Sequence, residues 1–318
     1  MKFLGKKLYK KLRLFYLILF KKGFIYHSFQ KHFTNLSLRG NMANIEKSFN
    51  NFIRKKEHQY YKQYQKSDNK DKEDLINCGV SSPFQIEEFL NNKTDILNYF
   101  KSHKVFYVKR GKKTYFEYDN NFDFELGYYD EGITLRCPYI VDIISNKKIL
   151  NCLSSYFSSP YKLDSVSCWW SFKNLEKVGV ENTRFFHRDI DNFNFIKVFL
   201  YLNDVDENSG PNQYLMYSHK KKYEKKISPR IIKDERIEKE KNIFTFTGKS
   251  GDAILANTFG IHRGSNPVSK NRLMMVMSFS LYNSSYCPNK PFLKKNELKT
   301  NLNFDHLNDY MLSNYIQN

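Results

Sequence analysis

Long hydrophobic runs are missing from this chain, although it has 318 residues and 41% of them are hydrophobic. The longest apolar stretch near the N-terminus is LFYLILF (14–20), far short of the ~20 residues that a helix needs to span a bilayer. No small-residue cleavage site follows it, so we expect neither a membrane-spanning helix nor a secretory signal peptide there. The length favours one principal domain with appendages, and the apolar content is sufficient for a real core.

Paired cysteine motifs are also missing. The five cysteines are odd in number, and no two of them are spaced as Cys-x-x-Cys. We therefore expect no disulfide framework, a reducing cytoplasmic environment and, for each thiol, the role of a small buried apolar side chain. The five are Cys78, Cys137, Cys152, Cys168 and Cys287.

Acidic residues are absent from residues 1–22, which hold eight of the lysines and arginines in a chain of net charge +19. If this segment is helical, apolar side chains share one face and basic side chains lie opposite. The apolar set is Leu4, Leu8, Leu12, Phe15 and Leu19. Such a helix can lie in an anionic membrane interface, so we predict peripheral membrane contact through residues 1–22, with packing on the protein's own domain or on a partner as the alternative.

Recognised nucleic-acid-binding motifs are missing too. The sequence has no zinc-finger spacing, no aromatic-rich RNA-binding signature and no Gly/Arg repeat. Net positive charge alone is weak evidence for nucleic-acid binding, so we expect that nucleic acid is not a partner. The positive charge slightly favours an anionic small-molecule substrate, and the amphipathic N-terminus slightly favours a lipid-linked one.

The hydrophobic period changes near residue 104. Before it, residues 82–103 read as a pair of helices with Ser82 as the N-cap. After it, short runs rich in β-branched and aromatic residues, among them ITLRCPYIV (133–141), predict strands, and one helix near 141–157 interrupts them. A few helices followed by many short strands indicate an α+β chain with a β-sandwich or barrel core.

An HxD pair, His187 and Asp189, lies in the otherwise aromatic and apolar stretch TRFFHRDIDNF (183–193). On a strand, side chains at i and i+2 leave on the same face, so the imidazole and the carboxylate can offer two adjacent ligands to one metal ion. Two His and one carboxylate on one face of an octahedron leave three positions open, as in non-haem Fe(II) oxygenases. By itself, however, the HxD pair is better explained as a polar strand end with a hydrogen-bonded His.

The candidate third ligand is His262, which ends a strand-like run in GDAILANTFGIHRGSNPVSKNR (251–272). Arg272 follows ten residues later, and a hairpin between the two segments would bring it near the metal. An Arg in that place can bind a carboxylate bidentately, as an organic diacid cosubstrate would need. The HxD pair, a long gap, a Gly-Asp turn, His262 and Arg272 together form a far more specific pattern than the pair alone.

In this order, the stretches resemble the phytanoyl-CoA dioxygenase family of Fe(II)/2-oxoglutarate-dependent oxygenases. FFHRD fits the metal motif, and VFLYLNDVDENSGPNQYLMYSHK (198–220) fits the strand and turn that follow it. GKSGDAILANTFGIHRGSNP (248–267) fits the distal His strand, and NRLMMVMSFS (271–280) fits the strand of the cosubstrate Arg. The resemblance covers about residues 130–285. It departs at MYSH (216–219), where family members usually show Pro-Gly-Ser-His, a difference that concerns the loop and not the ligands.

The resemblance implies a double-stranded β-helix, which is a jelly-roll, cupin-like fold, with flanking N-terminal helices. It implies His187, Asp189 and His262 as Fe(II) ligands and Arg272 as the partner of the distal carboxylate of the cosubstrate 2-oxoglutarate. Related halogenases lack the carboxylate ligand. Asp189 therefore favours hydroxylation of a small organic or lipid-like substrate, with release of succinate and CO2, over halogen transfer.

On this basis we expect four parts along the chain. Residues 1–45 are the basic amphipathic appendage and residues 46–105 a helical N-terminal region. Residues 106–285 are the double-stranded β-helix oxygenase domain, with an insertion at about 219–241. Residues 286–318 are a C-terminal tail.

Two other functions stay open from the sequence. A non-catalytic β-barrel that binds a partner or a membrane surface would show no iron-dependent turnover of a cosubstrate, and the intact set of ligands counts against it. A cupin-like metalloenzyme without 2-oxoglutarate would bind metal but would be indifferent to Arg272→Ala.

Overall fold

The computed structural model describes residues 35–65, 70–109, 111–119, 124–173, 185–220, 232 and 234–317. The amphipathic segment predicted for residues 1–22 and most of the insertion predicted at about 219–241 lie outside these ranges.

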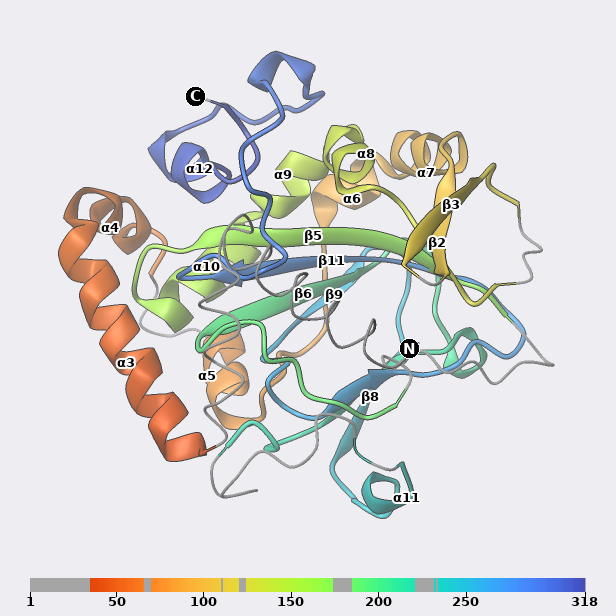
Figure 1. Ribbon diagram of the computed structural model, residues 1–318, viewed down its shortest axis with the longest axis horizontal. Coiled ribbons are helices and arrows are strands. Elements are labelled where there is room, and N and C mark those ends of the chain that lie inside the picture. The colour runs from red at the N-terminus through yellow and green to blue at the C-terminus, as the bar shows by residue number, and fades with distance from the viewer. Residues whose placement is uncertain are drawn as a thin grey trace, which may run out of the picture.

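Two antiparallel sheets form the core of the protein (Figure 1). The large sheet has the strand order β1-β9-β6-β11-β5-β4-β2-β3, and the small sheet has the order β10-β7-β8. The strands of the large sheet, in that order, are Phe84–Gln85, Asp252–Ala256, Phe195–Tyr201, Arg272–Ser280, Lys162–Ser171, Leu126–Tyr128, Val105–Lys109 and Lys112–Phe116. Those of the small sheet are His262–Gly264, Asn212–Leu215 and Ile243–Phe246.

The chain alternates between the two sheets. Strands β5, β6, β9 and β11 lie in the large sheet, whereas β7, β8 and β10 lie in the small one. Between β5 and β6, an isolated antiparallel bridge joins His187 to His262 and so places the His187 segment beside the small sheet. This winding defines a double-stranded β-helix, and the predicted jelly-roll fold is confirmed.

Helices cover the outer face of the large sheet, and Figure 1 shows α6, α8, α9 and α12 on one side of β5. None of the helices in the described part of the chain is both long and apolar enough to cross a bilayer. The α-helices are α3 Leu36–Ile53, α4 Lys55–Lys62, α5 Lys70–Asn77, α6 Glu87–Asn91, α7 Lys93–Lys101, α8 Glu131–Arg136, α9 Ile140–Ile144, α10 Lys147–Phe157, α11 Asp234–Ile237 and α12 His306–Met311. Two short 3-10 helices, η2 and η3, span Glu207–Ser209 and Lys295–Glu297.

Alternation along β6 and β11 separates a helix-side core from a cavity between the sheets, because successive side chains on a strand leave on opposite faces. The helix-side set is fully apolar and consists of Ile196, Val198, Leu200, Leu273, Met275, Met277 and Phe279. The cavity-side set carries two charged groups and consists of Lys197, Phe199, Arg272, Met274 and Val276. The large sheet therefore packs one face against helices and carries charged side chains on the face that lines the cavity.

The strand predicted at residues 133–141 is wrong, because this stretch contains the end of α8, a turn and the start of α9. All five residues of α9 are buried, and Ile140, Val141, Ile143 and Ile144 belong to the main hydrophobic core. The single helix predicted near 141–157 is in fact two helices, since the Asn146 side chain accepts hydrogen bonds from the backbone N–H groups of Lys148 and Ile149 and begins α10.

The N-cap predicted at Ser82 is also wrong, although two helices do lie within residues 82–103. Phe84 and Gln85 form β1, which pairs with Ala253 and Asp252 at the edge of the large sheet. Phe84 is buried there, so sheet pairing and burial override the local helix-start signal.

The Tyr214 side chain fixes the backbone that leads to His262. Its hydroxyl donates a hydrogen bond to the Asn257 carbonyl over 2.9 Å. The hydroxyl lies against Gly79 and Gly260, where a Cβ on either residue would overlap it. Both positions therefore require glycine while Tyr214 is present.

Gly260→Ala is expected to destabilise the protein by about 1–3 kcal/mol, because the added methyl group forces Tyr214 out of its place. The matched control is Gly40→Ala in α3, where no atom lies within 4 Å of the new Cβ. That control should stabilise the protein by about 0.5–1 kcal/mol, since Ala is the better helix former. Urea unfolding of the two variants measures the difference, and equal stabilities would contradict the overlap.

Candidate metal centre

The small sheet brings His187 and His262 side by side. Each residue donates its backbone N–H to the other's carbonyl, over 2.9 and 3.0 Å, and the two imidazole rings are 4.4 Å apart between centroids. The Asp189 N–H donates to the Thr258 carbonyl over 2.9 Å. This hydrogen bond holds Asp189 beside the segment that leads from Thr258 to His262. The i, i+2 pair thus enters one cavity, as predicted from its spacing.

The three side chains converge on one point. Their ligand atoms all lie within 4.8 Å of one another, and all three residues are buried or nearly so. His187 Nε2 is 3.6 Å from Asp189 Oδ1, and His262 Nε2 is 3.3 Å from Asp189 Oδ2. This is a 2-His-1-carboxylate set, the donor set of non-haem Fe(II) sites with open positions.

Backbone carbonyls fix which nitrogen of each His faces the centre. His187 Nδ1 lies 2.8 Å from the Phe185 carbonyl, and His262 Nδ1 lies 3.0 Å from the Gly260 carbonyl. A carbonyl can only accept, so both Nδ1 atoms carry the proton. In each ring Nε2 is then the nitrogen that faces the centre, which is the orientation that outer partners commonly give to ligating histidines.

The charge states also suit metal binding. Burial, together with the neighbouring His262, lowers the pKa of His187 to about 4, so its ring is neutral at pH 7. Burial alone would raise the pKa of Asp189, but the Lys197 ammonium and the two imidazoles hold it well below its usual range. His187 and Asp189 are therefore each in the form that binds a metal ion without the loss of a proton.

Lys197 and Asp191 belong to this cluster, although the sequence analysis did not single them out. The Lys197 ammonium lies 2.8 Å from Asp189 Oδ2 and 2.7 Å from Asp191 Oδ2. Both carboxylates are buried, and 16% of the Lys197 side chain is exposed. Burial would lower the pKa of Lys197, but the two carboxylates raise it above its usual value. A signal was present in FIKVFLY (195–201), where one ammonium interrupts an apolar strand.

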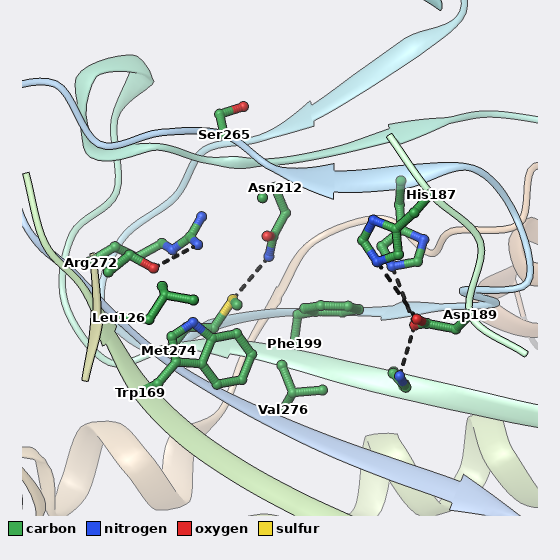
Figure 2. A pocket seen from close by; sticks show the side chains of 14 residues that line it. Leu126, Trp169, His187, Asp189, Phe199, Asn212, Ser265, Arg272, Met274 and Val276 are labelled. Atoms are coloured by element: carbon green, nitrogen blue, oxygen red, sulfur yellow. Dashed lines mark hydrogen bonds and ion pairs between the residues drawn. The ribbon is translucent and has the colours of Figure 1, made fainter. Parts of the chain in front are cut away.

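Arg272 lies at the other end of the same cavity (Figure 2). It is buried at the start of β11, and its guanidinium donates to the Gly210 carbonyl and, over 3.1 Å, to Ser171 Oγ. The predicted hairpin with the His262 segment is wrong, because β10 and β11 belong to different sheets. Arg272 instead faces the ligand set across the cavity.

Apolar side chains line the space between the two ends. They are Leu126, Trp169, Phe199, Met274 and Val276, and Figure 2 shows them below the line from Arg272 to His187. A molecule that spanned this space would meet a cation at one end and the ligand set at the other, with few groups that could retain water between them.

The MYSH turn supports the His262 segment without contributing a ligand. Ser218 Oγ accepts the Ile261 N–H over 2.7 Å and donates to the Leu215 carbonyl over 2.6 Å. His219 lies apart from the three ligand-type residues, and its Nε2 donates to the Ile76 carbonyl over 3.1 Å.

His219→Gln should change the acid sensitivity of the metal-free chain. Burial lowers the pKa of His219 to about 4, below the ordinary 6.5, so the unfolded chain takes up this proton first as the pH falls. The stability contributed by neutral His219 is present above pH 6.5 and is lost between about 6.5 and 4, by at most about 1.4 kcal/mol per pH unit.

Glutamine can keep the hydrogen bond to Ile76 and cannot titrate in this range. The free energy of unfolding of both chains is measured with denaturant, in the presence of a chelator, at pH 7, 6 and 5. As the pH falls, it should decrease less in the variant than in the unaltered chain. If the free energy of unfolding depends on pH in the same way in both chains, His219 titrates alike in the folded and unfolded states.

Comparison with known proteins gives structural matches only. No protein-family model matches the chain, and no curated protein matches its sequence. Among solved structures, it is similar to HygX from Streptomyces hygroscopicus with nickel, 2-oxoglutarate and hygromycin B bound, at 13% identity and a TM-score of 0.44, over 67% of this chain and 87% of HygX.

Two further matches come from nogalamycin biosynthesis. The non-heme α-ketoglutarate-dependent epimerase SnoN is 13% identical, with a TM-score of 0.42, over 68% of this chain and 84% of SnoN. The non-heme α-ketoglutarate-dependent carbocyclase SnoK is 9% identical, with a TM-score of 0.45, over 67% of this chain and 83% of SnoK. Because these TM-scores are below 0.5, the fold assignment rests on the strand order, and the matches assign no activity to this chain.

Proposed function

We propose that the chain is an Fe(II)- and 2-oxoglutarate-dependent oxygenase of the phytanoyl-CoA dioxygenase type that hydroxylates a small organic substrate. The observation that carries the proposal is the pairing of two features in one cavity. A buried His187–Asp189–His262 set occupies one end, and a buried Arg272 faces it from the other. HygX has 2-oxoglutarate bound in its solved structure, and SnoN and SnoK depend on the same compound under its other name, α-ketoglutarate.

Different residues would bind the metal ion and the cosubstrate. Nε2 of His187, Nε2 of His262 and one oxygen of Asp189 would hold Fe(II), and three positions of an octahedron would stay open. When bound, the iron and 2-oxoglutarate supply the oxidation, in which 2-oxoglutarate, O2 and a substrate C–H bond give succinate, CO2 and an alcohol.

Arg272 would bind the distal carboxylate of 2-oxoglutarate through the fork of its guanidinium, and Ser171 orients that fork. The apolar lining between the two ends would exclude water from the reacting atoms. Asp189 fills the ligand position that is left for a halide in related halogenases, which favours hydroxylation over halogen transfer.

Sequence features alone support the remaining parts of the proposal. We place the enzyme in the cytoplasm, in keeping with five cysteines that form no disulfide. Residues 1–22 would contact a membrane surface peripherally, and the substrate would be a small molecule of anionic or lipid-linked character.

Anaerobic titration of the metal-free chain with Fe(II) and 2-oxoglutarate tests the proposal. A visible metal-to-ligand charge-transfer band should appear in the unaltered chain and be absent from His187→Ala. Folded protein without such a band would exclude 2-oxoglutarate chemistry. Metal binding without the band would leave the cupin-like alternative.

A further inference from the structure

Lys197 competes with a metal ion for the same carboxylate. Its ammonium is 2.8 Å from Asp189 Oδ2, so this oxygen already has a charged partner. Asp189 Oδ1 lies on the side of His187 Nε2, at 3.6 Å. Asp189 Oδ2 also faces an imidazole, since His262 Nε2 lies 3.3 Å from it. The two oxygens are nevertheless unequal, because Oδ2 alone is also held by the Lys197 ammonium.

Asp191 fixes the position of that cation. Its Oδ2 lies 2.7 Å from Lys197 Nζ, and its side chain is as deeply buried as the others of the cluster. With a carboxylate on either side, the ammonium is held between two partners and cannot leave Asp189 without giving up both interactions in a poorly hydrated place. Asp189, Asp191 and Lys197 together carry a formal charge of −1.

A carboxylate can bind a metal ion through one oxygen or through both. The two His and one oxygen of Asp189 would occupy three of six positions, and 2-oxoglutarate as a chelate would occupy two more. One position is then left for O2. If Asp189 bound through both oxygens, no position would remain.

We propose that Lys197 is a positioning residue that restricts Asp189 to one-oxygen metal binding and thereby keeps one coordination position open. This inference rests on the proposed function. Lys197 acts on the coordination number through Oδ2 of Asp189, and Asp191 holds its ammonium in place.

The test uses a double variant, Lys197→Met with Asp191→Asn, in the full chain. It removes one positive and one negative charge, so the formal charge of the cluster stays at −1 and only the restraint on Asp189 is lost. Asp191→Asn alone is the matched control, because the amide oxygen of Asn can still accept a hydrogen bond from the Lys197 ammonium and so keep it beside Asp189.

Nitric oxide reports the open position. Metal-free protein is loaded anaerobically with Fe(II) and saturating 2-oxoglutarate, exposed to nitric oxide, and the S = 3/2 iron-nitrosyl signal is counted per bound iron by electron paramagnetic resonance. The unaltered chain and Asp191→Asn should give about one spin per iron, and the double variant should give at least about fivefold less, with no loss of Fe(II) affinity.

An unchanged signal per iron in the double variant would overturn the inference. So would a weaker affinity for Fe(II), because Lys197 would then support metal retention and not coordination number. If the double variant does not fold, Lys197→Val in the Asp191→Asn background replaces it, since valine suits a strand. If the unaltered chain binds no Fe(II), or shows no 2-oxoglutarate band, the proposed function fails at that step and the inference fails with it.

Discussion

An Asp189→Ala chain is expected to bind Fe(II) at least about 100-fold more weakly than the unaltered chain, a larger loss than the 10–100-fold typical when an outer partner of a ligand is removed. The substitution deletes the anionic ligand and leaves the two imidazoles of His187 and His262. It also leaves the Lys197 ammonium facing the metal position with Asp191 as its remaining carboxylate. Electrostatic attraction to a divalent cation is therefore lost together with one bond.

Calorimetric titration of metal-free protein with Fe(II) under argon measures this loss. His187→Ala and His262→Ala should weaken binding in the same way, since each removes an oriented Nε2 lone pair. Asp95→Ala is the control, because that exposed carboxylate pairs with Lys299 and does not line the cavity. Undiminished Fe(II) affinity in folded Asp189→Ala would exclude this residue as a ligand.

Replacing Arg272 with methionine should separate cosubstrate binding from metal binding. Affinity for 2-oxoglutarate is expected to fall by about 10- to 150-fold, the cost of hydrogen bonds to a charged group. Affinity for Fe(II) should change little, because Arg272 lies at the far end of the cavity from the ligand set. Methionine fills similar space and leaves no buried charge behind.

Arg263→Met is the matched control for Arg272. Arg263 follows His262 in β10, but its guanidinium contacts Gln213, at 2.8 Å, and the Phe186 ring, at 4.2 Å to the centroid. Titration of 2-oxoglutarate into Fe(II)-loaded protein, followed by the visible band, should distinguish the two variants clearly. Equal affinities for 2-oxoglutarate in both would mean that the cosubstrate carboxylate is bound elsewhere.

The grouping of the ligand-type residues was predictable because strand geometry is regular. In an extended segment the side chains of an HxD pair leave on the same face and so point into the same cavity. His187 and Asp189 do this even though the pairing of His187 with His262 is a single isolated bridge. The side of β11 on which Arg272 lies follows from the same alternation. Its route to the cavity did not follow from the sequence, because spacing does not reveal that the chain changes sheets between β10 and β11.

Lys197 shows a different limit. Its presence in an apolar strand marks it as an unusual residue, and alternation places it on the face of Phe199. Its partner Asp191 lies in an irregular segment between two sheets, where no period predicts the direction of a side chain. The strand wrongly predicted at 133–141 has a related cause, because short apolar runs occur in buried helices and in strands alike.

The position of the Tyr214 hydroxyl also constrains how this sequence can evolve. Gly79, Tyr214 and Gly260 are far apart in the sequence, yet neither glycine can gain a side chain while the tyrosine stays. A mutation at Gly260 can be tolerated only after Tyr214 has become smaller, so the order of these two substitutions is constrained, whereas Gly79, at a φ of +89°, is strained by any side chain. Related chains should therefore keep Gly79 and carry either Tyr214 with Gly260 or a joint replacement of these two. Covariation between positions 214 and 260 would identify chains with the same His262 loop even where overall identity has been lost.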